Sequence, residues 1–166
     1  MSTDGSSLSL GPKQILGGLA AIGLVVSAFL NWADVSGLGG AQLKGTDVPV
    51  EFLVDKNTDS SDPSILVLLV IAAVLLAIGA FVVSSARGMG IAGAALGIVV
   101  VVLYCVQVQR GLDDELAGLD IGLFDFISTG VYVALVAGVV GLVSALMPSA
   151  EAVSPAPSPP SAPSPA

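Results

Sequence analysis

Histidine is absent from this 166-residue chain, and cysteine occurs once, at Cys105. Without histidine, the chain lacks the commonest general base and the commonest metal ligand of proteins. A single cysteine can form no intrachain disulfide, no CxxC redox pair and no cysteine zinc site, which excludes membrane disulfide-exchange enzymes. Because Cys105 lies inside a long apolar run, we interpret its thiol as a small apolar group.

Charge is also scarce, since only 11% of the residues are charged whereas soluble domains carry about 25%. Lys and Arg together number 5 against 13 Asp and Glu, and the net charge is −8. Phosphate binding needs a basic face, so nucleic acid is excluded as a partner. With 54% hydrophobic residues, the composition is typical of a membrane protein whose partner is the lipid bilayer.

The clearest apolar run is Ser64–Val83, SILVLLVIAAVLLAIGAFVV, which has no ionisable or amide side chain. About twenty helical residues match the ~30 Å hydrocarbon core of a bilayer. We predict an all-α integral membrane protein, an up-down bundle of four transmembrane helices that forms one domain over 1–147. The predicted spans cover about 15–35, 63–84, 89–109 and 123–147.

The first apolar run has a second interpretation, a secretory signal peptide with Lys13 as its basic region and a cleavage site after Val26-Ser27-Ala28. The long polar lead and the continuation of the run past that site favour a retained span. Trp32 closes this span, and we predict that it is an interfacial anchor because indole prefers the headgroup level.

Two segments outside the spans have patterns of their own. Alternating Val48, Val50, Phe52 and Val54 indicate a short strand, which could pair with 41–44 across a turn to make a β-hairpin in the first outer loop. From residue 148 to 166 the chain is a Pro/Ser/Ala sequence that cannot bury a core, so we predict a disordered tail.

Small residues recur at a spacing of four in the third and fourth spans. Such rows allow two helix backbones to approach closely in lipid. They have two interpretations: a face for association with another copy or another membrane protein, or packing between helices of one bundle. The helix-packing candidates are Gly93, Gly97, Gly130, Ala134, Gly138 and Gly141.

No Asp, Glu, Lys or Arg falls in the middle of a predicted span, and this argues against a proton-coupled transporter. No Ser–His or Asp–Asp pair can be assembled in a span either, so we predict a protein that is not an enzyme and has no cofactor.

Acidic residues gather in two predicted loops on one side of the membrane. The first imitates the opening of a calcium loop, but Ser60 stands where the turn glycine is needed and Leu66 where the closing Glu belongs. We therefore predict no metal site, while a divalent cation between the loops stays an alternative. Its candidate ligands are Asp55, Asp59, Asp113 and Asp114.

Basic residues are divided between the two sides of the predicted bundle. Lys13 and Arg87 adjoin span ends on one side, whereas Lys44, Lys56 and Arg110 lie on the other. The positive-inside rule, applied to the two residues at span ends, favours both termini in the cytoplasm. We therefore expect a multi-pass protein of the cell membrane.

The layout resembles that of small four-span membrane proteins of high-GC bacteria. The likeness rests on a first span that ends in FLNW, a long outer loop, a short Arg/Gly turn between two spans and a last span reading GVYVALVAGVVGLV. It implies topology and no activity. We expect an accessory or structural protein that associates with itself or with a larger membrane complex through its small-residue faces. The alternatives are a small oligomeric or holin-like pore, and an extracytoplasmic sensor of a cation or ligand.

Overall fold

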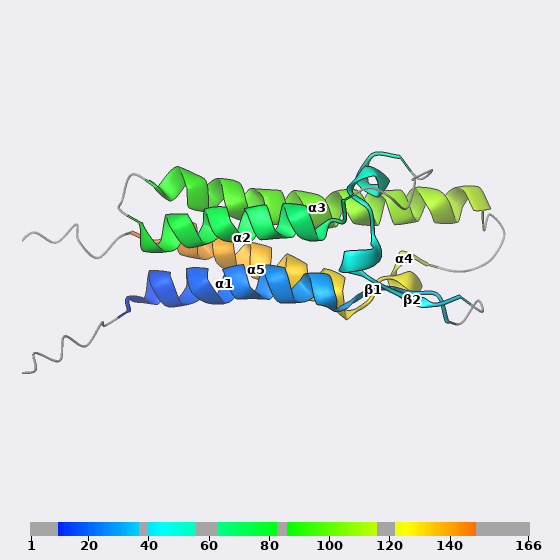
Figure 1. The fold of residues 1–166 in the computed structure, drawn as a ribbon, viewed down its shortest axis with the longest axis horizontal. Coiled ribbons are helices and arrows are strands. Elements are labelled where there is room, and N and C mark those ends of the chain that lie inside the picture. Colours follow the sequence, from blue (N-terminus) through cyan, green and yellow to red (C-terminus); the bar gives the residue numbers. More distant parts are fainter. Residues whose placement is uncertain (1–9, 37–39, 56–62, 83–85, 116–121, 149–166) are drawn as a thin grey trace, which may run out of the picture.

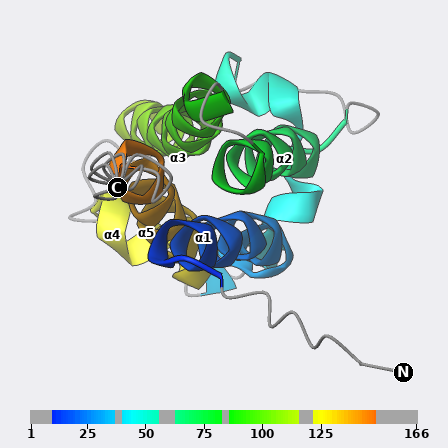
Figure 2. The ribbon, with the colours of Figure 1, turned by 90° about the vertical axis from the view of Figure 1, so that its left-hand side faces the viewer.

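The computed structural model describes residues 10–36, 40–55, 63–82, 86–115 and 122–148. Within them, the longer helices are α1 (Pro12–Phe29), α2 (Leu66–Phe81), α3 (Arg87–Glu115) and α5 (Thr129–Leu146), with the short α4 (Leu123–Phe126) before α5. The four longer helices form a ring in which α1 and α3 each lie between α2 and α5 (Figure 2). Neighbours run antiparallel, so the predicted mostly helical, up-down arrangement is confirmed (Figure 1).

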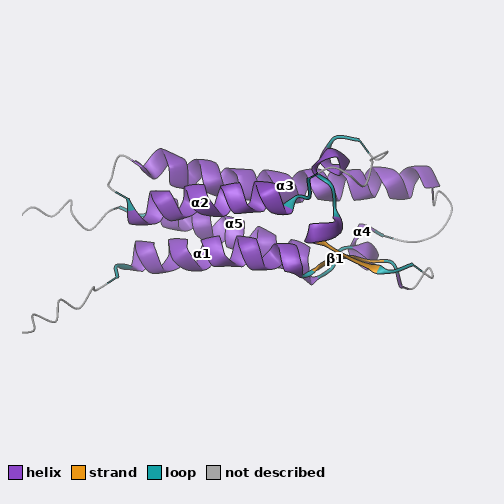
Figure 3. Ribbon diagram, viewed as in Figure 1, coloured by secondary structure: helices purple, strands orange, loops and turns teal. Residues whose placement is uncertain are grey.

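A small region of two short strands and three short helical turns lies at one end of the bundle (Figure 3). We call it the cap, and it comprises β1 (Asn31–Asp34), β2 (Gln42–Lys44), the 3-10 turns η2 (Gly45–Asp47) and η3 (Val50–Leu53), and α4. Strands β1 and β2 pair antiparallel, with Ala33 opposite Leu43 and Asp34 opposite Gln42. A small hairpin is therefore present next to the bundle.

The partners in this hairpin differ from the predicted ones. The segment from Val48 to Val54, expected as a strand, contains the 3-10 turn η3 instead. Its backbone pairs with the other end of its own loop, since Val50 N donates to Pro63 O at 2.8 Å and Ile65 N donates to Val48 O at 2.9 Å. The residues 42–44 are thereby left to pair with β1. Apolar alternation alone could not distinguish these two pairings.

Among the described residues, three helices are long and apolar enough to span a membrane: Pro12–Phe29, the Arg87–Asp113 part of α3, and Thr129–Leu146. Helix α2 is apolar but shorter, with 16 residues. Helix α3 has 29 residues, roughly 43 Å at 1.5 Å per residue, so its last turns project past the bundle beside the cap (Figure 1).

The helix boundaries differ from the predicted spans at the cap end. Helix α1 ends at Phe29, because the chain turns into β1, whereas the first span was expected to reach residue 35. The expected acidic loop after residue 110 begins as helix, up to Glu115. The last span is interrupted at Ile127 and Ser128, since Ile127 bridges to Ala33 of β1. The predicted tail lies outside the described residues except for Pro148.

Polar hydrogen bonds join three helix ends at the other end of the bundle. Ser144 Oγ in α5 donates to the carbonyl oxygen of Lys13 in α1 at 2.8 Å. Arg87 Nε donates to Ala145 O at 3.2 Å, and its Nη2 donates to Leu146 O at 2.9 Å. Lys13 and Arg87 therefore lie at the end away from the cap, where α1 begins and α5 finishes.

We expect Arg87→Gln to lower the free energy of unfolding by about 1–2 kcal/mol, because a charged donor to the last carbonyls of α5 is lost. The guanidinium is exposed, so screening keeps the effect modest. Thermal unfolding in detergent measures the change. The matched control is Arg110→Gln, at an exposed position of α3, and equal losses in the two variants would contradict a specific role for Arg87.

Candidate functional site

Trp32 is the centre of the cap. It follows α1 directly, so its indole folds back over the last turn of that helix, where it is 0% exposed. The indole Nε1–H donates to Ser27 O at 2.7 Å, and Ser27 Oγ donates to Leu24 O at 2.7 Å. The interpretation of Trp32 as an interfacial anchor is thus corrected: the ring is enclosed by protein, because this turn aims it inward.

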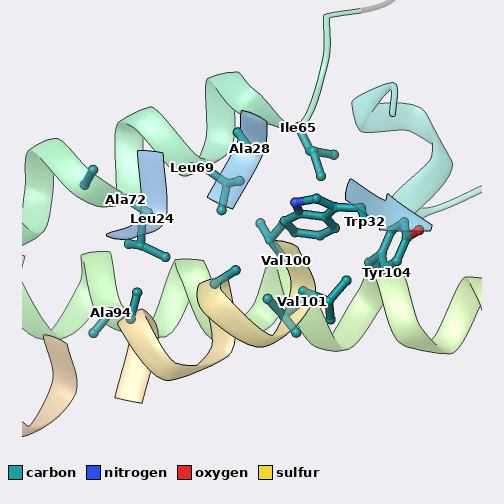
Figure 4. Packing of buried hydrophobic residues seen from close by; sticks show 14 of the residues in the cluster. Leu24, Ala28, Trp32, Ile65, Leu69, Ala72, Ala94, Val100, Val101 and Tyr104 are labelled. Carbon is teal, nitrogen blue, oxygen red and sulfur yellow. The ribbon is translucent and has the colours of Figure 1, made fainter. Parts of the chain in front are cut away.

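Two more aromatic rings pack around Trp32, and we call the three the aromatic cluster. The Tyr104 ring meets the indole edge-on, with centroids 5.0 Å apart and planes at 86°. Phe52 lies 5.8 Å from Tyr104 at 52°. Figure 4 shows Trp32 and Tyr104 side by side, with Val100, Val101 and Ile65 around them. The cluster joins β1, η3 and α3, so it fastens the cap to the bundle.

Glycines make room for the indole on two sides. A Cβ at Gly45 would lie 2.8 Å from the indole Nε1, and a Cβ at Gly130 would meet the indole Cδ1. Gly130 lies in the first turn of α5, and Ser128 N just before that turn donates to Trp32 O at 3.0 Å. The first small residue of the fourth-span row therefore faces the cap core of its own chain.

The other small residues of α5 also face inward. A Cβ at Gly138 would lie 2.7 Å from Ile98 Cγ1, and a Cβ at Gly141 would meet the side chain of Leu76. Ala134, between Gly130 and Gly138, is completely buried. Of the two interpretations of the rows, the structure supports packing within the bundle.

The row in α3 is used in the same way. A Cβ at Gly93 would lie 2.5 Å from Ala72 O and 2.7 Å from Leu76 N, so the backbones of α2 and α3 are in contact there. A Cβ at Gly97 would lie 3.0 Å from the Leu24 side chain of α1. These glycines are buried in the bundle, and the association face expected from them is not on its outside.

The acidic candidates are not brought together in the described part of the chain. Asp113 is exposed on α3 and accepts a hydrogen bond from Gln109 Nε2 at 2.9 Å. Asp55 is exposed just after η3. Asp59 and the side chain of Asp114 lie outside the described residues. Among the described residues, no three His, Cys, Asp or Glu gather closely enough to hold a metal ion.

A polar network on the hairpin was missed by the sequence interpretation. Asn31 Nδ2 donates to Gln42 Oε1 at 2.7 Å, and Gln42 Nε2 donates to Asp34 Oδ2 at 3.0 Å. The Ser36 hydroxyl and backbone N–H both donate to Asp34 Oδ1, at 2.6 and 3.0 Å. The spacing Asp-x-Ser is typical of such a side-chain-capped turn and could have indicated it. The network stabilises the hairpin on its exposed side.

These hydrogen bonds lower the pKa of the Asp34 carboxyl below its ordinary value of 3.8, with the Ser36 hydroxyl as the largest cause. Because the folded pKa is the lower one, the carboxylate stabilises the hairpin above pH 3.8 and this contribution disappears as the pH falls through the folded pKa. We expect Ser36→Ala to raise the Asp34 pKa more than Gln42→Ala does, as measured by NMR titration of the carboxyl carbon. An unchanged midpoint in Ser36→Ala would refute this assignment.

No protein-family model, curated protein or solved structure matches this chain.

Proposed function

We propose that this chain is an integral protein of the cell membrane, with an accessory or structural role, whose helices α1, α2, α3 and α5 all cross the bilayer. The outward faces of the helices support this, because they are apolar, as the core is. Leu19, Ile22 and Val136 are among the exposed side chains. A bundle that is apolar on both sides is suited to lipid as its solvent.

Helix α2 is included as a span because of its place in the ring. Its 16 residues reach roughly 24 Å, slightly less than a ~30 Å core. It packs along both α1 and α3, which have the length to cross. A helix between two spanning neighbours shares their solvent, and local thinning of the bilayer accommodates its shorter length.

The observation that carries the structural role is the close packing of the helices against one another. The backbones of α2 and α3 touch at Gly79 and Gly90 and again at Gly93. In the described residues, the Asp, Glu, Lys and Arg residues lie toward the two ends of the bundle. Lys13 and Arg87 are at one end, and the others are at the end with the cap and the projecting part of α3. Such a closely packed, uncharged interior favours a scaffold over a path for protons or solutes.

The polar residues of α5 favour the same choice over a pore. A pore needs polar side chains along one stripe of a helix. Ser144 is buried and bonded to α1, whereas Tyr132 points outward. The polar groups of α5 thus belong to different faces.

The orientation that we propose places the cap outside the cell. Lys13 and Arg87 share the end away from the cap, next to the helix ends that would meet the cytoplasm. Basic residues close to span ends are retained on the cytoplasmic side. Both termini are then cytoplasmic. The small-residue rows are buried in contacts between helices of the same chain. A partner would therefore bind the outward helix faces or the cap.

Purification of the tagged full-length protein from membranes in a gentle detergent tests this proposal. We expect the protein to stay in the membrane pellet after a carbonate wash and to co-purify reproducibly with other membrane proteins or with further copies. An unrelated tagged four-span protein is the control for non-specific capture. Recovery only as a monomer, even after cross-linking in intact membranes, would contradict the role in association, and ion flux through liposomes containing the pure protein would favour the pore.

A further inference from the structure

The aromatic residues of the chain fall into two groups. All of them, one Trp, two Tyr and five Phe, lie in the described residues. Four belong to the interior of the cap end, as the aromatic cluster and Phe126. The other four are exposed: Phe29 at 56%, Phe81 at 50%, Phe124 at 75% and Tyr132 at 46%.

The exposed aromatic residues lie at the ends of the bundle helices. Phe29 is the last residue of α1 and Phe81 the last of α2, whereas Tyr132 lies in the first turn of α5. Phe124 lies in α4, which leads into α5. The large exposed side chains in the middle of these helices, such as Ile22 and Val136, are aliphatic. The exposed aromatic residues therefore lie at the ends of the bundle helices, and exposed aliphatic residues lie in the middle.

The register of α1 against α5 puts two of these rings at one height. A Cβ at Gly17 would lie 2.9 Å from Ser144 Oγ, and a Cβ at Gly23 would lie 3.0 Å from Ala137 Cβ. The two helices are antiparallel, so the same register continued toward the cap brings Phe29 level with Tyr132. This height is where both helices reach the cap.

The aromatic rings also continue the apolar outer surface. On α1 the exposed Val26 lies one turn before Phe29, and on α5 the exposed Val136 lies one turn after Tyr132. A Tyr at the margin of an apolar belt is typical of the bilayer interface, where its hydroxyl stays hydrated among the headgroups. Phe29, at the same level, continues the apolar surface up to that margin. Phe124 is just beyond this margin, on the short helix before α5. Continuity with the apolar belt favours lipid over a protein partner as the occupant of this surface.

We propose that Phe29, Phe124 and Tyr132 form an aromatic belt that lies in the headgroup layer of one leaflet and sets the depth of the bundle in the bilayer. This inference rests on the proposed membrane-spanning function and adds the residues that contact the lipid interface. The belt separates the lipid-embedded bundle from the cap. It takes the anchoring role that the sequence pattern had assigned to Trp32.

Labels on single cysteines test the belt in the full-length protein reconstituted into phosphatidylcholine vesicles. In a Cys105→Ala background, an environment-sensitive fluorophore is attached at Phe124→Cys or Tyr132→Cys. Val136→Cys is the control for lipid contact in mid-span, and Arg110→Cys is the control for water at the projecting part of α3. All four positions are exposed, so the substitutions leave the packed core intact.

We expect the labels at both belt positions to be quenched most by a nitroxide on the lipid headgroup, and the Val136 label most by a nitroxide deep in the acyl chain. The Arg110 label should respond only to iodide in the water. If either belt label behaves like the Arg110 label, or is shielded from both quenchers as under a protein partner, while Val136 reports lipid, the belt is overturned and the membrane assignment stands. If the Val136 label also responds only to iodide, the membrane assignment itself fails.

Discussion

Trp32→Ala is expected to lower the free energy of unfolding by about 3–5 kcal/mol, the range for removing a large buried aromatic side chain. The indole is completely buried, meets Tyr104 edge-on and donates its N–H to Ser27 O. Its loss leaves a cavity where α1, α3, α5 and the cap meet, because Gly45 and Gly130 have no side chains to fill it. Unfolding of the detergent-solubilised protein by added SDS, followed by circular dichroism, measures the change.

Two further variants separate the parts of this effect. Trp32→Phe keeps an aromatic ring and loses the N–H, so we expect a smaller loss than in Trp32→Ala. Phe124→Ala removes an aromatic side chain that is three-quarters exposed, and its unfolding free energy in detergent should hardly change. A Trp32→Ala loss no larger than that of Phe124→Ala would contradict the central place of the indole.

Gly93→Ala is expected to lower the unfolding free energy by about 1–3 kcal/mol, more than an added methyl group at Gly138. A Cβ there would lie 2.5 Å from Ala72 O and 2.7 Å from Leu76 N. Both atoms belong to the backbone of α2, so no side chain can turn away and the two helices must separate. The same SDS titration measures the loss.

The controls for Gly93 are two other glycines with different surroundings. At Gly138 the nearest atom to an added Cβ is Ile98 Cγ1. This atom belongs to a side chain that can shift, so we expect Gly138→Ala to cost less than Gly93→Ala. At Gly111 nothing lies within 4 Å, and alanine should stabilise α3 by up to about 1 kcal/mol through its helix propensity. Equal effects at the three positions would show that α2 and α3 do not approach as closely as described.

Much of the helical layout could be predicted, because the signals involved are local. Continuous apolar runs in the sequence indicate the four longer helices α1, α2, α3 and α5. The cap was harder to predict. Whether Val48–Val54 pairs with 41–44 or with 63–65 depends on contacts between segments that are distant in the chain, and period-two alternation is compatible with both.

The candidate site was predictable only in its residue types. Spacing of four identified Gly93, Gly97, Gly130 and Gly138 as residues for close helix approach, yet spacing does not show which helix approaches. The same holds for Trp32: its position next to a span end is compatible with facing lipid or protein. The turn into β1 decides between them, since it directs the indole at Ser27 O.

The sequence by itself determined that the chain forms long apolar helices with its charges at their ends, because hydrophobicity and helix length are properties of contiguous residues. Only the tertiary structure decided which side of each helix is enclosed. It turned the small-residue rows and Trp32 inward and left Phe29, Phe124 and Tyr132 outside. The physical reason is that an apolar side chain is compatible with both lipid and a protein core, so hydrophobicity cannot choose between them, whereas the fit of neighbouring helices can.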